Sequence, residues 1–172
     1  KYLSTITLNI QIMSKSTLPR LKALRDEMGK AGITAFIIPG TDPHQSEYYA
    51  SHWAARTWIS GFDGSAGTAV VTTNQAGLWT DSRYFLQAAQ QLEDSGFELF
   101  KEGLPDTPTI EQWLLTTLPQ GATIAIDGTL FGASKAAAMK RNFESHGFRF
   151  VSDFTPFDSI WAVSYTHLRA HE

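Results

Sequence analysis

The spacing of apolar residues near the start of the chain predicts an amphipathic helix. Apolar side chains recur there at intervals of three and four residues, as on one face of an α-helix: Leu18, Leu21, Leu24 and Met28. Ser16 or Thr17 is a suitable N-cap, and Pro19 fits the first turn, where its missing N–H is not needed. Gly29 or Gly32 is expected to end the helix.

The rest of the chain alternates between short β-branched runs and longer helical patterns. Strands are expected over residues 33–39, 68–73, 78–81, 97–101, 122–126 and 148–151. Helices are expected over residues 83–92, 109–118 and 134–145. A turn at residues 74–77 joins the second and third strands into a hairpin. Because strands and helices alternate after this hairpin, the pattern predicts an α/β fold, a mixed sheet of about six strands with helices on both faces.

The composition fits one soluble domain and excludes several classes of function. Of the 172 residues, 42% are hydrophobic and 18% are charged, which is enough for a buried core. The net charge of −3 leaves no basic surplus for binding nucleic acid. The chain has no cysteine, which excludes disulfides, iron–sulfur ligation and thiol catalysis. No apolar run approaches the roughly 18 residues of a membrane helix. We therefore expect a cytoplasmic domain with neither nucleic acid nor membrane as a partner.

The two ends of the chain differ from its middle. Residues 1–12 precede Met13, which opens a suitable native start, and they lack the apolar core and cleavage site of a secretory signal. Residues 162–172 carry two of the five histidines and no turn pattern. We expect a non-native leader over residues 1–12, one domain over residues 13–161 and a non-native tail over residues 162–172. A genuine short strand at the start is the alternative for the leader.

Three glycines within residues 61–67 (GFDGSAG) predict a tight backbone excursion. The spacing is not the GxGxxG of a dinucleotide site, and a strand rather than a helix follows it. Ser65 does not fit a nucleophile elbow, because Asp63 replaces the first glycine of GxSxG and the order is loop to strand. The interpretation is that the glycines let this loop pass close to another segment of the chain.

A cluster of metal-ligand residue types lies in a predicted polar loop, in residues 42–47 (DPHQSE), with His52 further along. Asp, His and Glu bind divalent metals, but no second cluster completes a ligand set, so no metal site is predicted. Asp42 or Glu47 is suited to cap a turn, with His44 bonded locally in a structural or cleft-lining loop.

The sequence WTDSRYF, residues 79–85, places a strand end directly before a helix start. Asp81 or Ser82 is the expected N-cap. Arg83 then lies in the first turn, where a cation opposes the helix dipole, and this indicates a role beyond helix stability. The alternative is a structural salt bridge from Arg83 to Asp81 or Asp63. The residues alone yield no carboxylate pair, no catalytic triad and no complete metal site.

Three motifs, in this order and at these separations, resemble the N-terminal domain of Xaa-Pro aminopeptidase (aminopeptidase P) of the long, three-domain, cytosolic type. They are residues 42–48 (DPHQSEY), 60–68 (SGFDGSAGT) and 79–85 (WTDSRYF). Residues 103–109 (GLPDTPT) and the pair Trp113 and Leu114 add to the resemblance. It spans roughly residues 17–161, nearly all of the expected domain.

The resemblance implies a creatinase-type N-terminal domain, a mixed six-stranded sheet flanked by helices with a ribonuclease H-like motif. It also implies a full-length hydrolase that removes the N-terminal residue from peptides with proline in second position. Such enzymes use two divalent ions, usually manganese, that share a bridging water. Their five metal ligands belong to a C-terminal domain beyond this chain, so no catalytic residue and no metal ligand is expected here. Domains of this type shape the substrate cleft and contribute to a homodimer or a larger assembly.

The resemblance also assigns roles to single residues. The arginine of the family's Trp-Thr-Asp-x-Arg motif, which helps bind the substrate peptide, falls on Arg83. Its guanidinium can orient peptide carbonyls or a terminal carboxylate through bidentate bonds. His44 and Asp81 are the expected cleft-lining residues. One departure is that the Arg-Pro pair that follows Trp161 in the family is missing, in keeping with a non-native tail.

Two other functions stay open. A non-catalytic member of the pita-bread superfamily would use this domain as a protein-binding module, as in histone chaperones, although such a module needs no substrate arginine. A creatinase-like amidinohydrolase would share the fold but not this set of motifs. Five metal ligands in the order Asp, Asp, His, Glu, Glu in the rest of the reading frame would support the peptidase.

Overall fold

The computed structural model describes residues 2–40 and 54–160 of the 172-residue chain, with side chains for residues 17–40 and 55–160. Its helices are α1 (Tyr2–Ala31), α2 (Ala54–Ser60), α3 (Phe85–Gln91), α4 (Ile110–Thr117) and α5 (Ala133–Ser145), with 3-10 turns η1 (Ser82–Tyr84) and η2 (Gly128–Leu130). Its strands are β1 (Ala35–Pro39), β2 (Thr68–Thr72), β3 (Ala76–Thr80), β4 (Glu98–Lys101), β5 (Thr123–Ile126) and β6 (Arg149–Val151). None of the described helices is both long enough and apolar enough to cross a membrane.

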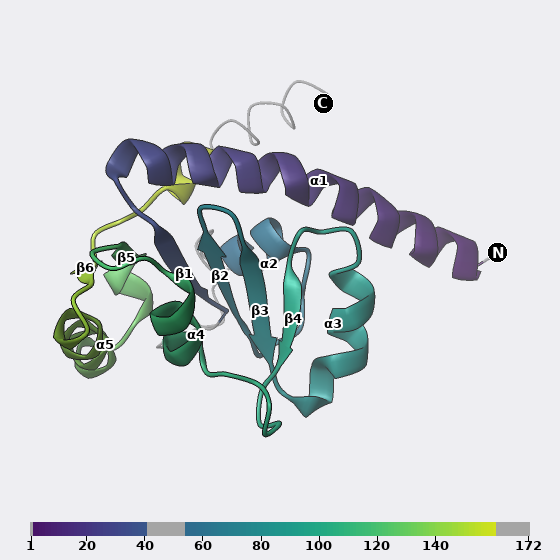
Figure 1. The fold of residues 1–172 in the computed structure, drawn as a ribbon. Coiled ribbons are helices and arrows are strands. Elements are labelled where there is room, and N and C mark those ends of the chain that lie inside the picture. The colour runs from purple at the N-terminus through teal and green to yellow at the C-terminus, as the bar shows by residue number, and fades with distance from the viewer. Residues whose placement is uncertain (1, 41–53, 161–172) are drawn as a thin grey trace.

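The strands form one mixed, six-stranded sheet in the order β4-β3-β2-β1-β5-β6 (Figure 1). The pairs β1–β2 and β2–β3 are antiparallel, whereas β3–β4, β1–β5 and β5–β6 are parallel. The antiparallel β2–β3 pair is the predicted hairpin. The parallel pairs β3–β4 and β5–β6 are each joined through a helix, α3 and α5 respectively. The predicted mixed sheet of about six strands is confirmed.

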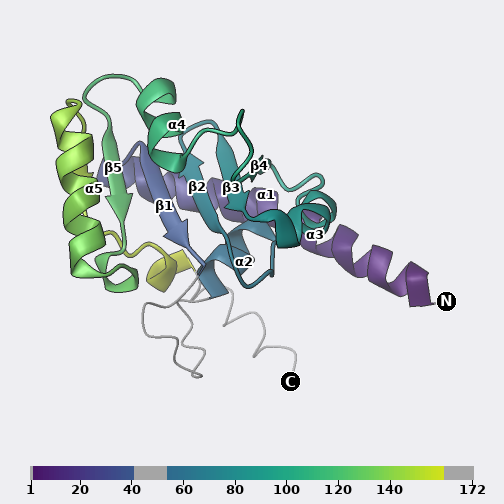
Figure 2. The same cartoon turned by 90° about the horizontal axis from the view of Figure 1, so that it is seen from below.

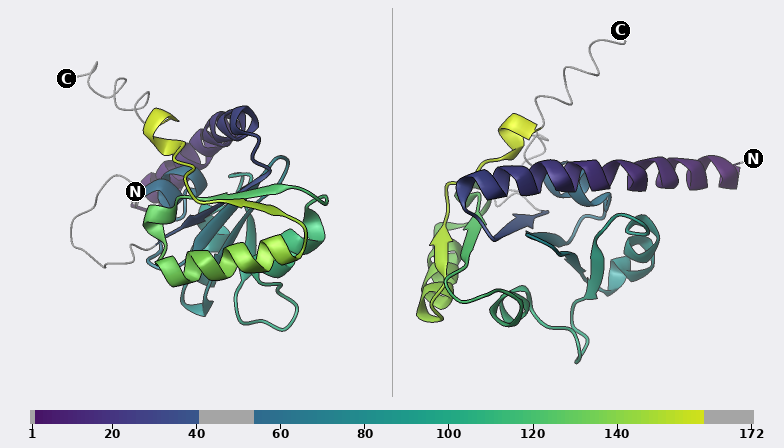
Figure 3. Two further views of the ribbon diagram at one scale, coloured as in Figure 1. Left: turned by 90° about the vertical axis from the view of Figure 1, so that its left-hand side faces the viewer. Right: turned by 45° about the horizontal axis from the view of Figure 1, so that its top comes forward.

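Helices cover both faces of the sheet, as the sequence predicts, and α1 and α5 lie on opposite sides of it (Figure 3). One core cluster packs α1, α2 and α3 against the first face, and a second cluster packs α4 and α5 against the other. Successive residues of β1 alternate between them, because side chains along a strand point to opposite faces. Phe36 and Ile38 belong to the first cluster, and Ala35 and Ile37 belong to the second.

Helix α1 is longer than predicted. The expected N-cap at Ser16 or Thr17 is wrong, because the helix begins at Tyr2 and contains Pro19 in its interior. No glycine or proline lies upstream of Pro19, and the helix continues through this proline although its ring removes one backbone hydrogen bond. The Thr17 hydroxyl instead donates to the carbonyl of Ser95 at 2.9 Å and ties α1 to the turn before β4. The predicted boundary after residue 12 lies inside this helix, whose N-terminal part extends past α3 (Figure 1).

The predicted glycine stop of α1 is confirmed at Gly32. This residue has a φ of 70°, a left-handed conformation that glycine adopts without the penalty of a side chain. Its N–H bonds to the carbonyl of Gly29 at 3.2 Å, and the Ile33 N–H bonds to the carbonyl of Met28 at 2.8 Å. These two bonds make a Schellman motif, which satisfies the last carbonyls of the helix.

The sequence pattern does not predict α2. This seven-residue helix buries one apolar pair, Ala55 and Ile59, and places Arg56 in the interior as well. A single apolar pair one turn apart does not distinguish a helix from a loop. The helix lies beside β1 and β2 (Figure 2), where it carries Arg56 under the loop that joins α2 to β2.

The other predicted helices differ from the structure only in detail. The helix expected over residues 83–92 is divided between η1 and α3. The helix expected over residues 109–118 is α4, and it begins with a capping box. The Gln112 N–H donates to the Thr109 hydroxyl at 3.2 Å, and the Thr109 N–H donates to the Gln112 side chain at 3.0 Å.

Candidate functional site

The end of β1, the start of β2 and the end of β3 meet at one edge of the sheet. Strand pairing places Pro39 opposite Thr68, and Thr68 opposite Trp79. The loop of residues 61–67 enters β2 from this edge, and η1 leaves β3 from it. Two of the three motifs that carry the resemblance therefore lie together in space.

Asp81 and Arg83 form a two-pronged ion pair at this edge. The Arg83 Nε donates to Asp81 Oδ1 at 3.0 Å and the Nη2 donates to Oδ2 at 2.8 Å. Asp81 Oδ1 also accepts the Arg83 backbone N–H at 3.1 Å, so the predicted N-cap at Asp81 is confirmed. The predicted salt bridge between Arg83 and Asp81 is present, and both side chains reach solvent, with 67% of the Arg83 side chain and 35% of the Asp81 side chain exposed.

The pair keeps its two charges and leaves part of the guanidinium free. The hydrogen bonds from Arg83 hold the pKa of the Asp81 carboxyl below its usual value, and the same bonds raise the pKa of Arg83. Asp81 engages one edge of a group that has five N–H donors. Within the part of the chain that the structure describes, the Arg83 Nη1 has no hydrogen-bond partner. No other described residue of the domain bonds to that edge of the guanidinium.

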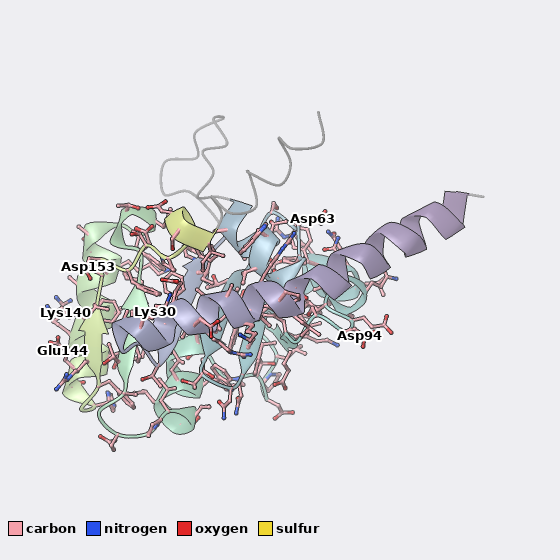
Figure 4. The ribbon with its side chains drawn as sticks, turned by 90° about the horizontal axis from the view of Figure 1, so that it is seen from above. Lys30, Asp63, Asp94, Lys140, Glu144 and Asp153 are labelled. Atoms are coloured by element: carbon pink, nitrogen blue, oxygen red, sulfur yellow. The ribbon has the colours of Figure 1, made fainter. Side chains whose placement is uncertain are left out.

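Asp63, the other proposed partner of Arg83, is bonded elsewhere. Its Oδ1 accepts from the Gln87 amide at 2.7 Å and from the Gln91 amide at 2.8 Å. The Asp63 backbone N–H donates to the Gln91 side chain at 3.2 Å. These bonds fasten the loop to α3, on the opposite side of the molecule from the α5 residues Lys140 and Glu144 (Figure 4).

Two hydroxyl groups fix the second half of the same loop. The Thr80 hydroxyl, at the end of β3, donates to the carbonyl of Ala66 at 2.7 Å. The hydroxyl groups of Ser65 and Tyr84 are hydrogen-bonded to each other. Tyr84 adjoins Arg83, and its ring centroid lies 5.3 Å from the Arg83 Cζ. The loop is therefore tied directly to the turn that carries the arginine.

Arg56 holds the loop from beneath, and the sequence did not reveal it. Only 3% of this residue is exposed. Its Nη1 donates to the Gly67 carbonyl at 3.0 Å, and its Nη2 donates to the Gly64 carbonyl. Its Cζ lies 5.0 Å from the Phe62 ring centroid, and its buried Nε has no hydrogen-bond partner among the described residues. Burial lowers the pKa of Arg56 to about 10. An arginine in a stretch without helical pattern is usually solvated, so only the missed helix α2 would have signalled this role.

The expected close approach of the glycine-rich loop is confirmed. A Cβ added at Gly67 would lie 3.1 Å from the carbonyl oxygen of Trp79, and Gly67 has a φ of 156°. A Cβ added at Gly64 would lie 2.3 Å from the Phe62 ring and 2.9 Å from the Tyr84 ring. The glycines allow backbone to pass where a side chain would collide.

His44 and the rest of residues 42–47 lie outside the described residues, as does His52. Among the residues that the structure does describe, no group of three or more His, Cys, Asp or Glu side chains is arranged to hold a metal ion. The cleft-lining role of His44 stays a prediction.

The side chains of Asp81 and Arg83 are exposed, and they lie apart from the cavity on the other side of the domain. A cavity of about 540 Å³ lies on the α4–α5 side of the sheet and includes neither Asp81 nor Arg83. Its lining includes Ile37, Trp79, Ile110, Phe131 and Met139. Arg83 lies outside this cavity, on the exposed surface of the domain.

The chain belongs to the creatinase/prolidase N-terminal domain family, whose model matches residues 20–160. It is 42% identical to aminopeptidase P2 of Arabidopsis thaliana over 156 residues. That match covers 90% of this chain and 22% of the Arabidopsis protein, so the chain spans about a fifth of its relative's length.

Solved structures agree with this assignment. The chain is similar to an X-prolyl aminopeptidase from Caenorhabditis elegans, described as a cytosolic enzyme with a di-nuclear active site. The TM-score is 0.69 and the identity 35%, over 76% of this chain and 21% of that one. The N-terminal domain of the FACT complex subunit SPT16 from chickpea matches with a TM-score of 0.58 and 15% identity, over 86% of this chain and 38% of that one. The second likeness is one of fold alone.

Proposed function

We propose that this chain is the N-terminal domain of a metal-dependent Xaa-Pro aminopeptidase and that it supplies one wall of the substrate cleft. The observation that carries the proposal is the free edge of Arg83, held out by Asp81 at the sheet edge. Guanidinium N–H groups bind peptide carbonyls well, and an arginine whose rotamer is already fixed loses less entropy on binding. The substrates would be peptides with proline in second position.

The reaction itself is proposed to take place outside this chain. The chain spans about a fifth of its relatives' length, and one of those relatives is described as having a di-nuclear active site. We propose two divalent metal ions, manganese in the first instance, held by the remainder of the full-length enzyme. The metals would activate a water for attack on the scissile carbonyl, while this domain orients the peptide. On its own the chain would be inactive.

Residues 13–161 are proposed as the native domain, between a leader of residues 1–12 and a tail of residues 162–172. We also propose a cytoplasmic location and a homodimer formed by the full-length protein. His44 is proposed to line the cleft together with Asp81. The alternative is a protein-binding module without catalysis. Such a module would share the fold, but it would not explain the exposed guanidinium of Arg83.

Replacing Arg83 by alanine in the full-length enzyme is expected to raise KM for an Xaa-Pro peptide by about tenfold, because charged hydrogen bonds to the peptide are lost. Arg83→Lys is expected to be nearly as impaired, since an ammonium cannot reproduce the fork. Steady-state kinetics give KM and kcat, and elemental analysis gives the metal content, which should be unchanged. The matched control is Arg141→Ala, an exposed arginine on α5, which should behave as the parent enzyme. Unchanged peptide kinetics in Arg83→Ala would remove Arg83 from the site.

A further inference from the structure

The positive charge of Arg83 is neutralised within the domain by the carboxylate of Asp81. Asp81 engages it through two side-chain hydrogen bonds, at 3.0 Å and 2.8 Å. Both groups are ionised at neutral pH, so the pair as a whole is neutral. The exposed fork therefore offers directional N–H donors without a net positive charge.

This balance separates two kinds of acceptor. A peptide carbonyl is neutral and gains hydrogen bonds from the free edge of Arg83 with no penalty from Asp81. The terminal carboxylate of a short peptide would gain the same bonds, but it would also be repelled by the Asp81 carboxylate on the other edge of the same guanidinium. An arginine without its aspartate would favour the carboxylate.

We infer that Asp81 is a positioning and specificity residue: it orients Arg83 and makes the fork select neutral backbone carbonyls of a peptide rather than a free C-terminal carboxylate. The inference rests on the proposed function. It names the substrate class more closely, as peptides bound at this wall through their backbone, whether or not their C-terminus is charged.

The orienting role of Asp81 follows from its place in the chain. Its Oδ1 caps η1 by accepting the Arg83 N–H, and the same oxygen accepts from the Arg83 Nε. Backbone and side chain of the arginine are thus fixed by one carboxylate. The Tyr84 ring centroid lies 5.3 Å from the Arg83 Cζ, and the Tyr84 hydroxyl is itself hydrogen-bonded to Ser65. The guanidinium of Arg83 therefore has both a carboxylate and an aromatic ring as neighbours.

The test uses the full-length enzyme and two tripeptide substrates of the same Xaa-Pro-Xaa sequence, one with a free C-terminal carboxylate and one with a C-terminal amide. Asp81→Ser keeps an N-cap oxygen but removes the negative charge and the second prong. We expect this variant to change the acid-to-amide ratio of kcat/KM at least fivefold in favour of the free acid, relative to the parent enzyme. In an Arg83→Ala background, the same substitution should leave the ratio unchanged.

The outcomes are distinguishable. A shifted ratio that requires Arg83 supports the inference, because a merely structural effect of Asp81→Ser would lower activity on both peptides alike. The inference is overturned if Asp81→Ser leaves the ratio unchanged, or if the shift persists without Arg83. If Arg83→Ala itself leaves KM unchanged for both peptides, the proposed function fails as well. If Arg83→Ala raises KM but Asp81→Ser does not shift the ratio, the inference fails alone.

Discussion

Arg56→Ala is expected to lower the free energy of unfolding of this chain by about 3 kcal/mol. The substitution removes the donors to the carbonyls of Gly64 and Gly67 and leaves both acceptors unpaired, in a place where the arginine is only 3% exposed. It also removes the guanidinium from the face of the Phe62 ring. Part of the loss is offset, because the variant no longer buries a cation whose Nε has no hydrogen-bond partner in the described part of the chain.

Arg25→Ala is the matched control for this experiment. Arg25 on α1 also donates to two backbone carbonyls, those of Thr72 at 2.9 Å and Gln75 at 3.0 Å. It is half-buried, so water can replace the lost donors, and a loss of about 1 kcal/mol is expected. Urea unfolding followed by circular dichroism measures both values. Equal losses in the two variants would contradict the view that Arg56 is an interior support of the loop.

Gly40→Ala is expected to destabilise the chain by about 3 kcal/mol, because the added methyl group would collide with the Arg56 side chain. A Cβ at this position would lie 2.1 Å from the Arg56 Nη1 and 2.4 Å from the carbonyl oxygen of Gly67. Neither atom can move cheaply, because the guanidinium is buried and bonded to the loop and the oxygen belongs to the backbone. The substitution therefore has to displace the arginine from its bonds or shift the loop.

Gly29→Ala is a control that is expected to change the stability of the chain in the opposite direction. Nothing lies within 4 Å of a Cβ at Gly29, which is in the last part of α1. Alanine there should stabilise the chain by about 0.5–1 kcal/mol, because it restricts the unfolded state and favours the helix. Thermal unfolding of the two variants should move the midpoint in opposite directions. A Gly40→Ala variant as stable as the parent would contradict the close packing of Gly40 against Arg56 and Gly67.

The strands were predictable because the pattern of apolar and β-branched residues within each strand is enough to indicate it. In β1, alternate residues face two different cores, so all five residues of the strand, 35–39, are apolar and the run is typical of a buried strand. The start of α4 was predictable for a similar reason, since Thr109 and Gln112 satisfy each other's backbone. Interactions within a few residues leave a signal that a single sequence can show.

The features that the sequence did not show depend on distant partners. The sequence around Thr17 predicts a helix cap, but its hydroxyl donates a hydrogen bond to the carbonyl of Ser95, which is 78 residues away. The sequence around Arg56 predicts a solvated side chain. The carbonyls that Arg56 binds belong to a loop that is positioned by α3 and β3, which are distant in sequence. No local rule reports such contacts, since the tertiary structure overrides local preference.

The candidate site was predictable in part. The unfavourable place of Arg83 in a first helical turn indicated a further role, and the choice of partner lay between Asp81 and Asp63. The structure selects Asp81, because Asp63 is occupied by two glutamines of α3 that no sequence pattern connects with it.

The most direct test compares this chain with the full-length enzyme in one assay. Each protein is incubated with Mn²⁺ and an Xaa-Pro peptide, and release of the N-terminal residue is followed by chromatography. The account predicts that the full-length enzyme cleaves the peptide and that this chain alone produces no cleavage, because its part is to hold the peptide and not to activate water. Metal-dependent cleavage by this chain alone would contradict the account.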